Sequence, residues 1–571
     1  MSMIDILPDK STYRPGEPAG VAVTVANDTA APLRGQLVLE LATIHGVLCR
    51  SAQPVALAPG AGSTLRFTLH PPALPRRGYG LDATLYAGDA TGEDGQVLAR
   101  ASGALDVLER WSQAPRYGFL SDFAPQAAGQ EARYDSLLRY HVNVVQFYDW
   151  MWRHYQLLPP AEEFTDAMGR NLSLPSVRDA IAGVQQRGAA ALAYGAVYGA
   201  EPEFALAHPA LLLYDEETRP ISLAELFYIM NIAPGSPWVP LIVAEFAEAV
   251  RALDFDGIHL DQYGFPKTAW AASSEPVNLA DAFPPLIDQA RAAVVAAKPE
   301  AGVIFNAVGN WPVETVAPTT QDAVYIEVWP PDEDYADLVR LIRDARRLSA
   351  GKQVILAAYL APFAAAGPET LPGAEAAALL ATAAIAAAGG FHLLLGECAG
   401  ILCDPYYPKY ATMRPAFARQ MRTYYDFLVR YEEFLTAPEL QGCPSAPSGG
   451  ADGSPLQMTV TGVRVSRQPE AGALWTLARR KPGYHLVHLI NLADQTDTHW
   501  NALRTPAAGL GDLELAVSDL PAVRRVLLIS PDANQGRPLA VPWTQAGGML
   551  TVRVPRLVVW TVVVMMLASP P

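Results

Sequence analysis

Cysteine is scarce in this chain of 571 residues. There are four, Cys49, Cys398, Cys403 and Cys443, and they show neither CxxC spacing nor a nearby set of histidines. Zinc sites and redox dithiols need such spacings. We therefore predict free thiols in place of a disulfide framework. There is also no clustered Asp/Asn loop of the EF-hand type, and we predict neither a metal site nor a cofactor.

Several catalytic motifs are missing as well. The sequence has no glycine-rich phosphate loop, no GxSxG elbow and no HExxH helix. Each of these motifs supplies a specific geometry for phosphoryl transfer, serine hydrolysis or zinc-dependent proteolysis. These three reaction classes therefore lose their usual support.

Positive charge is in the minority. The chain has 42 Lys and Arg residues against 58 Asp and Glu residues, which gives a net charge of -16. A field of this sign repels phosphate groups. We therefore expect neither nucleic acid nor an anionic membrane as a partner, whereas neutral and cationic ligands remain possible. The oligomeric state is left open.

Long apolar runs are also missing. The longest, LVVWTVVVMMLA at 557–568, has twelve residues, which is too few to span a bilayer as a helix. We interpret it as the last buried strand. The N-terminus MSMIDILPDKSTYRPGEP has neither the basic nor the apolar region of a secretory signal. We expect a cytoplasmic protein as written, or a secreted one if a signal has been removed.

What the sequence has in abundance is apolar material for folded cores. Half of its residues are hydrophobic and 18% are charged, so disorder is not expected and a chain of this length should form several domains. Residues 1–112 consist of short alternating runs such as VAVTVAND and TLRFTLH, broken by Pro/Gly clusters. This pattern predicts a β-sandwich.

From residue 113 the pattern changes to strands alternating with helices. Eight apolar runs are separated by amphipathic segments: YGFLSDF, VNVVQFYDW, AAALAYGAVYG, DGIHLDQYG, AGVIFNAVGN, DAVYIEVW, KQVILAAYL and GFHLLLGE. Strands of this kind form a parallel sheet buried on both faces, and eight such units predict a (β/α)8 barrel over 113–436. A long segment, 200–231, follows the third run, and we expect it to cover a site.

The last part of the chain returns to short strands. A Pro/Gly/Ser-rich connector, TAPELQGCPSAPSGGADGSP, precedes runs such as HLVHLINL and VRRVLLIS. The pattern predicts a second β-domain over 437–571.

Acidic and aromatic side chains follow the runs of the predicted barrel. Because the carboxyl ends of its parallel strands meet at one face, these residues should gather there: Asp122, Tyr148, Asp149, Trp152, Tyr194, Tyr198, Asp261, Tyr263, Asn306, Trp311, Glu327, Trp329, Tyr359 and Glu397. Aromatic rings pack on the apolar faces of sugars, and carboxylates and amides bind their hydroxyl groups. The mixture favours a carbohydrate ligand.

Two of these carboxylates fit glycosidic cleavage, which needs one ionised and one protonated group. Asp261 ends the fourth predicted strand, and His259 lies on the same face of that strand. Glu327 ends the sixth predicted strand and stands between the apolar residues Ile326 and Val328. The pattern leaves alternatives open. An aspartate at a strand end is often a helix cap, the aromatic residues at these ends are individually more often packing than sugar platforms, and Asp122, Asp149 and Glu397 are rival carboxylates. Asp149 has a structural alternative too, an ion pair with Arg153 or His154.

Four motifs together resemble glycoside hydrolase family 66: QFYDWMWRH, DGIHLDQYG, VYIEVW, and HLLLGE followed by DPYYP. The resemblance implies retaining cleavage of α-1,6-glucan by a barrel between an N-terminal immunoglobulin-like β-domain and a C-terminal β-sandwich. It implies that Asp261 is the nucleophile and Glu327 the acid/base. The residues we expect at the substrate are Tyr148, Asp149, Trp152, Tyr198, His259, Asn306, Trp329 and Asp404.

Family 66 includes endo-dextranases and cycloisomaltooligosaccharide glucanotransferases. The resemblance implies that a cyclising member would carry a carbohydrate-binding module of about a hundred residues inserted late in the barrel. In this chain the stretch from DAVYIEVW to GFHLLLGE leaves no room for such a module. We therefore predict a dextranase-like hydrolase. The alternatives are a glucanotransferase, another retaining α-glycosidase such as an α-galactosidase-like barrel, and a non-catalytic glucan-binding protein.

Overall fold

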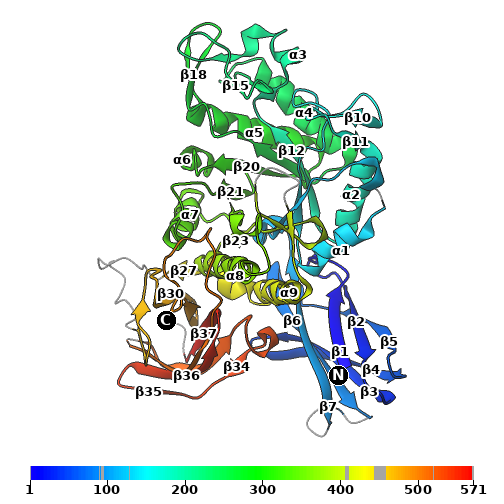
Figure 1. Ribbon diagram of the computed structural model, residues 1–571, viewed down its shortest axis with the longest axis vertical. Coiled ribbons are helices and arrows are strands. Elements are labelled where there is room, and N and C mark those ends of the chain that lie inside the picture. Colours follow the sequence, from blue (N-terminus) through cyan, green and yellow to red (C-terminus); the bar gives the residue numbers. More distant parts are fainter. Residues whose placement is uncertain are drawn as a thin grey trace.

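A computed structural model describes residues 2–88, 91, 95–127, 129–404, 410–442, 458–518 and 520–568. The protein is a mixed α/β structure. In Figure 1 the N-terminal strands (blue) and the C-terminal strands (orange and red) lie at one end of the molecule, and the helices with the parallel strands between them extend away from both.

The N-terminal region contains two antiparallel sheets. One has the order β1-β2-β5 and the other β4-β3-β6-β7. The inward positions of β2 alternate with outward ones, as the sequence pattern predicts, and Val21, Leu39 and Leu81 are among the residues of a shared buried cluster. The strands are β1 (Ser2–Pro8), β2 (Ala19–Asn27), β3 (Leu33–Thr43), β4 (Gly46–Leu57), β5 (Gly62–Leu69), β6 (Arg76–Ala87) and β7 (Val97–Leu108).

The central region is built on one curled sheet of eleven strands, most of them parallel. All eight predicted runs form strands of it. In chain order they are β8 (Tyr117–Leu120), β9 (Val144–Phe147), β12 (Ala190–Ala196), β17 (Gly257–Asp261), β20 (Gly302–Val308), β21 (Ala323–Glu327), β22 (Val354–Ala357), and the pair β23 (Phe391–His392) and β24 (Leu395–Gly396). Neighbours in the chain are neighbours in the sheet.

The eighth run is divided between two partners. Its first half, β23, pairs in parallel with β22, and its second half, β24, pairs in parallel with β8. Segment 391–396 thus contacts both the last and the first of the preceding seven strands. Two short antiparallel strands, β25 (Gly400–Leu402) and β26 (Tyr410–Thr412), continue the sheet beyond β24.

Helices connect these strands where the sequence predicts them. The longer ones are α1 (Glu131–Arg139), α2 (Leu174–Gln186), α4 (Trp238–Leu253), α5 (Leu279–Ala297), α7 (Tyr335–Leu348), α8 (Leu371–Ala388) and α9 (Pro415–Arg430), and the shorter ones are α6 (Val313–Val316) and α10 (Glu432–Leu435). The local sequence sets their ends: Asp334 and Asp337 form a capping box at the start of α7, and α8 stops at Gly389, which has a φ of 91°.

Helix α8 is the one described helix that is long and apolar enough to cross a membrane. However, 78% of it is buried inside the protein. It packs against α7 and β23. Its composition therefore suits a core helix that is covered on nearly all sides.

The predicted covering segment, 200–231, is ordered and has secondary structure of its own. It contains α3 (Pro202–Ala205), β14 (Leu213–Tyr214), β15 (Ser222–Leu223) and β16 (Phe227–Ile229). β16 pairs with β13 (Gly199–Ala200), and β14 pairs with the hairpin of β18 (Thr268–Ala271) and β19 (Pro276–Asn278), which follows β17. A second hairpin, β10 (Glu163–Thr165) and β11 (Asn171–Ser173), follows β9.

The C-terminal region contains two further sheets. One includes β27 (Gln441–Gly442), β29 (Val465–Ser466), β30 (Leu474–Lys481), β31 (Tyr484–Asn491), β33 (Val523–Ile529), β34 (Leu539–Ala540) and β37 (Trp560–Leu567), and the other β28 (Met458–Val460), β32 (Leu510–Val517), β35 (Trp543–Ala546) and β36 (Met549–Leu557). The apolar run at 557–568 contains β37, which is buried throughout, so its prediction as a last buried strand is confirmed. Much of the predicted connector, residues 443–455, lies outside the described residues.

The prediction of free thiols is confirmed at Cys49 and Cys398, which are exposed. Cys403 is buried. Cys443 lies outside the described residues.

Candidate active site

Asp261 and Glu327 meet at the carboxyl end of the curled sheet. Asp261 is the last residue of β17 and Glu327 the last of β21, and β20 with Asn306 lies between these strands. β17 and β20 begin at Gly257 and Gly302, where a Cβ on Gly257 would collide with the carbonyl oxygen of Gly302. The glycine permits the close approach of the two strands.

One amide group joins the two carboxylates. Asn306 Nδ2 donates to Asp261 Oδ1 at 2.8 Å and to Glu327 Oε2 at 3.1 Å. These two oxygens therefore lie less than about 6 Å apart, which fits the separation of about 5 to 5.5 Å typical of retaining glycosidases better than the longer separation of inverting ones. The Tyr194 hydroxyl donates to the other oxygen of Asp261 at 2.8 Å.

Burial makes both carboxyl groups hard to ionise. It raises the pKa of Asp261 to about 6, against the hydrogen bonds from Asn306 and Tyr194, which lower it. It raises the pKa of Glu327 to about 7, and the nearby negative charge of Asp261 adds to this rise. Near neutral pH, Asp261 is therefore mainly ionised while Glu327 keeps a large protonated fraction.

Two polar atoms around the pair are buried without a hydrogen-bond partner among the described residues. They are Asn306 Oδ1 and the Tyr263 hydroxyl. The Trp329 indole and the Tyr359 hydroxyl lie close enough to Glu327 to oppose the rise in its pKa. Buried polar atoms are normally paired, so this group has unused capacity for a polar ligand or water.

Two predicted substrate contacts lie beneath the carboxylates. His259 is 1% exposed and accepts or donates a hydrogen bond with the Tyr117 hydroxyl at 2.8 Å, and burial lowers its pKa to about 3, so it is neutral. Tyr198 is fully buried, and its hydroxyl donates to the Phe265 carbonyl and accepts from the Tyr263 amide. Tyr198 thus supports the loop that follows Asp261, whereas His259 is held by Tyr117 inside the sheet.

The residues after β9 lie on the other side of Asp261. Tyr148 packs edge-on against Tyr194, with 4.9 Å between ring centroids. Asp149 has a φ of 49° and raises the pKa of Asp261 by its charge, so it lies near that carboxylate. It forms an ion pair with Arg170 at 3.7 Å.

The two expected partners of Asp149 form ion pairs with other carboxylates, and the charge of Asp149 also contributes, after Glu201, to the raised pKa of His154. Arg153 pairs with Glu203 and His154 with Glu201, both at 2.9 Å. Trp152 is half-buried under the Arg153 guanidinium, 4.8 Å from its ring centroid.

Residues of the covering segment, 200–231, contact side chains near Asp261. Glu201 accepts from the His154 backbone amide and contacts its ring, and burial of this pair is nearly complete. Phe227 of β16 packs against the rings of His154 and Tyr263. The segment thus packs against His154 and Tyr263, two residues near enough to Asp261 for its charge to raise their pKa values.

Trp329 and Asp404 line a cavity of about 570 Å³ next to Glu327. Trp329 comes from the loop after β21 and Asp404 from the loop after β25. Residues 405–408 of the DPYYP motif lie outside the described residues.

Two rival carboxylates have other partners. Glu397 Oε1 accepts from the backbone amides of Ser121 and Asp122 at 3.0 and 3.1 Å, and Oε2 accepts from Arg133 Nε at 2.8 Å. Asp122 itself accepts from the Ala124 amide. The Glu397 carboxylate therefore ties the loops after β8 and β24 to α1.

Replacing Glu397 by glutamine should destabilise the fold. The variant removes one partner of a buried ion pair whose arginine is 2% exposed, a change that costs about 3 to 5 kcal/mol. The midpoint of urea unfolding measures it, with Glu369→Gln at an exposed position as the control. An unfolding midpoint equal to that of the wild type, together with lost catalysis, would return Glu397 to the list of catalytic candidates.

Sequence reasoning missed several neighbours of the pair. Tyr194 and Tyr359 stood at strand ends, which was a usable signal, but their contacts with Asp261 and Glu327 were not predicted. The cavity beside Glu327 is also lined by His499, Trp500, Asn501 and Ala502 from the C-terminal region. No local pattern in the sequence connects these four residues with a strand more than 160 positions earlier.

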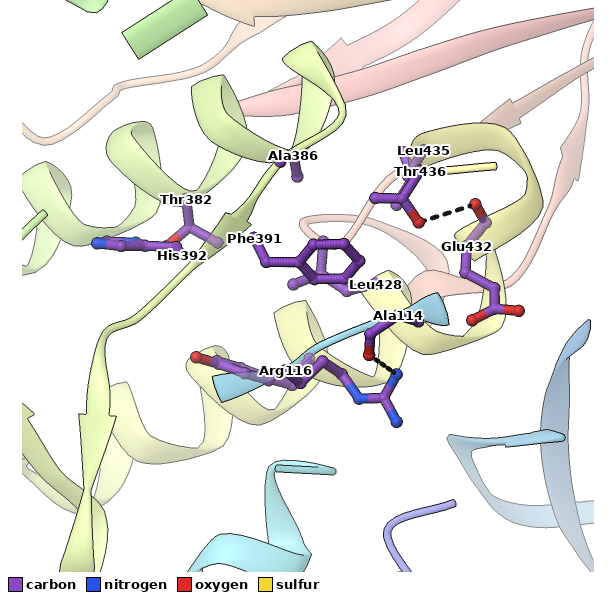
Figure 2. A pocket seen from close by; sticks show the side chains of 12 residues that line it. Ala114, Arg116, Thr382, Ala386, Phe391, His392, Leu428, Glu432, Leu435 and Thr436 are labelled. Atoms are coloured by element: carbon purple, nitrogen blue, oxygen red, sulfur yellow. Dashed lines mark hydrogen bonds between the residues drawn. The ribbon is translucent and has the colours of Figure 1, made fainter. Parts of the chain in front are cut away.

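A second cavity lies at the opposite edge of the sheet, where β8 and β23 begin (Figure 2). Arg116, Phe391 and Glu432 are among its lining residues, and its volume is about 20 Å³. A water molecule needs about 10 to 15 Å³ on this measure. The cavity therefore has room for a water molecule and none for a sugar.

A family model described as Glycosyl hydrolase family 66 matches residues 8–564. A cycloisomaltooligosaccharide glucanotransferase from Niallia circulans is 23% identical over 711 aligned residues, which cover 98% of this chain and 71% of that protein. A dextranase from Streptococcus salivarius is 23% identical over 462 residues, which cover 70% of this chain and 55% of the dextranase.

The fold has a solved counterpart. The structure of a Paenibacillus sp. cycloisomaltooligosaccharide glucanotransferase complexed with cycloisomaltoheptaose matches with a TM-score of 0.87 at 22% identity, covering 98% of this chain and 99% of the other.

Proposed function

Because the chain belongs to glycosyl hydrolase family 66 and is a glycosidase, we propose that it hydrolyses α-1,6-glucosidic linkages within dextran or isomaltooligosaccharides, with retention of configuration. The observation that carries this proposal is the single amide of Asn306 shared by Asp261 and Glu327. It keeps one oxygen of each carboxylate within about 6 Å of the other, which supports a double displacement over the wider spacing of inverting enzymes.

In the first step the Asp261 carboxylate attacks the anomeric carbon. Glu327 donates its proton to the departing 6-oxygen, so the C–O bond breaks as a glycosyl ester forms on Asp261. In the second step Glu327, now ionised, takes a proton from water, which attacks the same carbon and releases Asp261. Asn306 and Tyr194 fix the Asp261 carboxylate for attack, and Tyr148, Asp149, Trp152 and Trp329 are the proposed substrate contacts around the pair.

The architecture that we infer is a closed (β/α)8 barrel between two β-sandwiches. The pairing of segment 391–396 with both β22 and β8 supports closure, and the paired sheets with buried clusters in the N-terminal and C-terminal regions support the sandwiches. The domain limits at 112/113 and 436/437 stay predictions.

The short connection between β22 and β23 favours hydrolysis over cyclisation. Between β22 and β23 the chain holds a short 3-10 turn and α8, so no further domain is inserted there. The alignment with the Niallia circulans glucanotransferase is longer than this chain, so that relative has residues that this chain lacks.

Incubation with dextran tests the proposal. We expect linear isomaltooligosaccharides by mass spectrometry. Rings, each lighter by one water than the linear sugar of the same length, would assign the protein to glucan cyclisation instead. An unchanged polymer and unchanged isomaltooligosaccharides would contradict both activities.

The pH profile of kcat/KM should be a narrow bell. Below about pH 6 Asp261 takes up a proton and no longer attacks, and above about pH 7 Glu327 loses the proton that it must donate. Initial rates on an isomaltooligosaccharide between pH 4 and about pH 9 measure both limbs, with circular dichroism as the control for folding. A rate that stays constant up to the alkaline end would contradict the role of Glu327.

Asn306 should set the position of this bell. Its hydrogen bonds lower the pKa values of both carboxyl groups. In Asn306→Ala both limbs should therefore move to higher pH. Unmoved limbs would show that the shared amide does not control the two carboxyl groups.

A further inference from the structure

The cavity beside Glu327 is built from two distant parts of the chain. One wall is formed by Val328, Trp329 and Pro330, which follow Glu327 directly, and by Tyr359 after β22. The opposite wall is formed by residues 499–502, in the loop 492–509 between β31 and β32 of the C-terminal region. We call residues 492–509 the C-terminal loop.

The C-terminal loop is fastened to the loop before α7. The backbone amide of Trp500 donates to the Glu333 carbonyl at 3.0 Å, and its indole Nε1 donates to the Asp332 carbonyl at 2.9 Å. Thr498 adds a bond from its hydroxyl to the Asp334 carboxylate at 2.7 Å. Trp500 is only 3% exposed, so it serves as an anchor that positions its neighbours.

A second attachment joins the C-terminal loop to the turn after β22. Asn501 Oδ1 accepts from the Ala361 backbone amide at 2.9 Å, and Arg504 bonds within the C-terminal loop to Asp497 at 2.7 Å while 4% exposed. The wall is therefore fixed before any ligand arrives, which lowers the entropy that binding must overcome.

The lining chemistry suits a sugar unit. Trp329 and Tyr359 supply aromatic surface, and His499 and Asn501 are exposed polar side chains that also line the cavity. His499 Nδ1 lies 3.4 Å from an oxygen of Asp334, so Nε2 is the ring nitrogen that can face a ligand. The Asn501 amide nitrogen has no hydrogen-bond partner among the described residues, since the bond to Ala361 uses only its oxygen. The volume, about 570 Å³, lies within the range of about 300 to 1,000 Å³ usual for small-molecule sites.

We propose that the C-terminal loop forms one wall of an additional glucose-binding position next to Glu327, so that the C-terminal region takes part in substrate binding as well as in folding. His499 and Asn501 donate hydrogen bonds to hydroxyl groups of a glucose unit that lies beyond the cleavage point. This inference rests on the proposed α-1,6-glucanase function. Its consequence is selective: the position matters for chains long enough to reach it and not for the bond-breaking step.

The test is a double variant, His499→Ala with Asn501→Asp. The aspartate keeps an oxygen for the Ala361 amide while removing the amide donors, so the anchoring bond survives. For isomaltohexaose we expect kcat/KM to fall by about tenfold through KM, with kcat little changed, because two modest hydrogen bonds are lost. For the shortest isomaltooligosaccharide that the wild type cleaves, kcat/KM should remain the same.

Thr496→Ala is the matched control, because Thr496 is an exposed side chain of the same loop that is not among the residues lining the cavity. Calorimetric titration of isomaltohexaose into the double variant, made inactive by Asp261→Asn, should show binding weakened by about the same factor relative to Asp261→Asn alone.

The outcomes separate the inference from the function on which it rests. An equal loss of kcat/KM for short and long sugars, or no loss for either, in a wild-type enzyme that cleaves them would overturn the inference alone. A wild-type protein that cleaves no α-1,6-linked sugar of any length would overturn the proposed function and the inference together.

Discussion

Replacing Asp261 with asparagine should lower kcat on dextran by at least about four orders of magnitude, the scale seen when a nucleophile is removed. The change is nearly isosteric, so the Tyr194 hydroxyl keeps an oxygen acceptor, while the side chain loses the negative charge that attacks the anomeric carbon. Binding should be far less affected than turnover. Single-turnover kinetics and calorimetric titration of an isomaltooligosaccharide measure the two separately.

Asp28→Asn is the control for this variant, since Asp28 is exposed in the N-terminal region. The product formed with added azide identifies the role of the residue. In the Asp261 variant azide should occupy the vacated side of the sugar and yield the β-configured glucosyl azide, the inverted product. A loss of less than about tenfold in a folded protein is too small for a missing nucleophile and would remove Asp261 from that role.

Replacing Glu327 with glutamine should have the second largest effect. Loss of a general acid costs about 10² to 10⁴ in rate, and the loss should depend on the leaving group. Dextran, whose 6-oxygen leaves as an alcohol, needs the proton in full. An aryl α-glucoside with an acidic phenol needs it much less, so its first step should remain fast and its phenol should appear in a burst.

The second step of the Glu327 variant should then limit turnover, because water is no longer deprotonated. Azide, which needs no deprotonation, should restore turnover and give the α-configured glucosyl azide, the retained product. Glu314→Gln in α6, an exposed position, is the control. Equal losses for dextran and for the aryl glucoside would contradict the acid role of Glu327.

The acidic residues at the strand ends have different partners in the structure, and the strand-end pattern alone does not predict these partners. Asp261, Glu327 and Glu397 all follow apolar runs, and the sequence alone treats them alike. In the structure Glu397 has Arg133 and two backbone amides as partners, whereas Asp261 and Glu327 share an amide and have pKa values raised to about 6 and 7. Partners from α1 and β20 decide the difference, and neither is adjacent in sequence.

The ion pairs around Asp149 also differ from those expected from the sequence. Its sequence neighbours Arg153 and His154 were the expected structural partners, but they pair with Glu203 and Glu201 of the covering segment. Asp149 also pairs with Arg170, in the turn between β10 and β11. Long charged side chains form ion pairs with the residues that are close to them in the folded protein. These residues are often distant in sequence.

The sequence by itself determined the order and type of the main elements and the strand ends that carry Asp261 and Glu327. It could do so because alternation and helical periodicity are local, and because parallel strands present their carboxyl ends at one face. Only the tertiary structure decided that Glu397 pairs with Arg133, that Asn306 joins Asp261 and Glu327, and that the C-terminal loop lines a cavity beside Glu327. Those facts depend on contacts between residues tens to hundreds of positions apart, which no local pattern encodes.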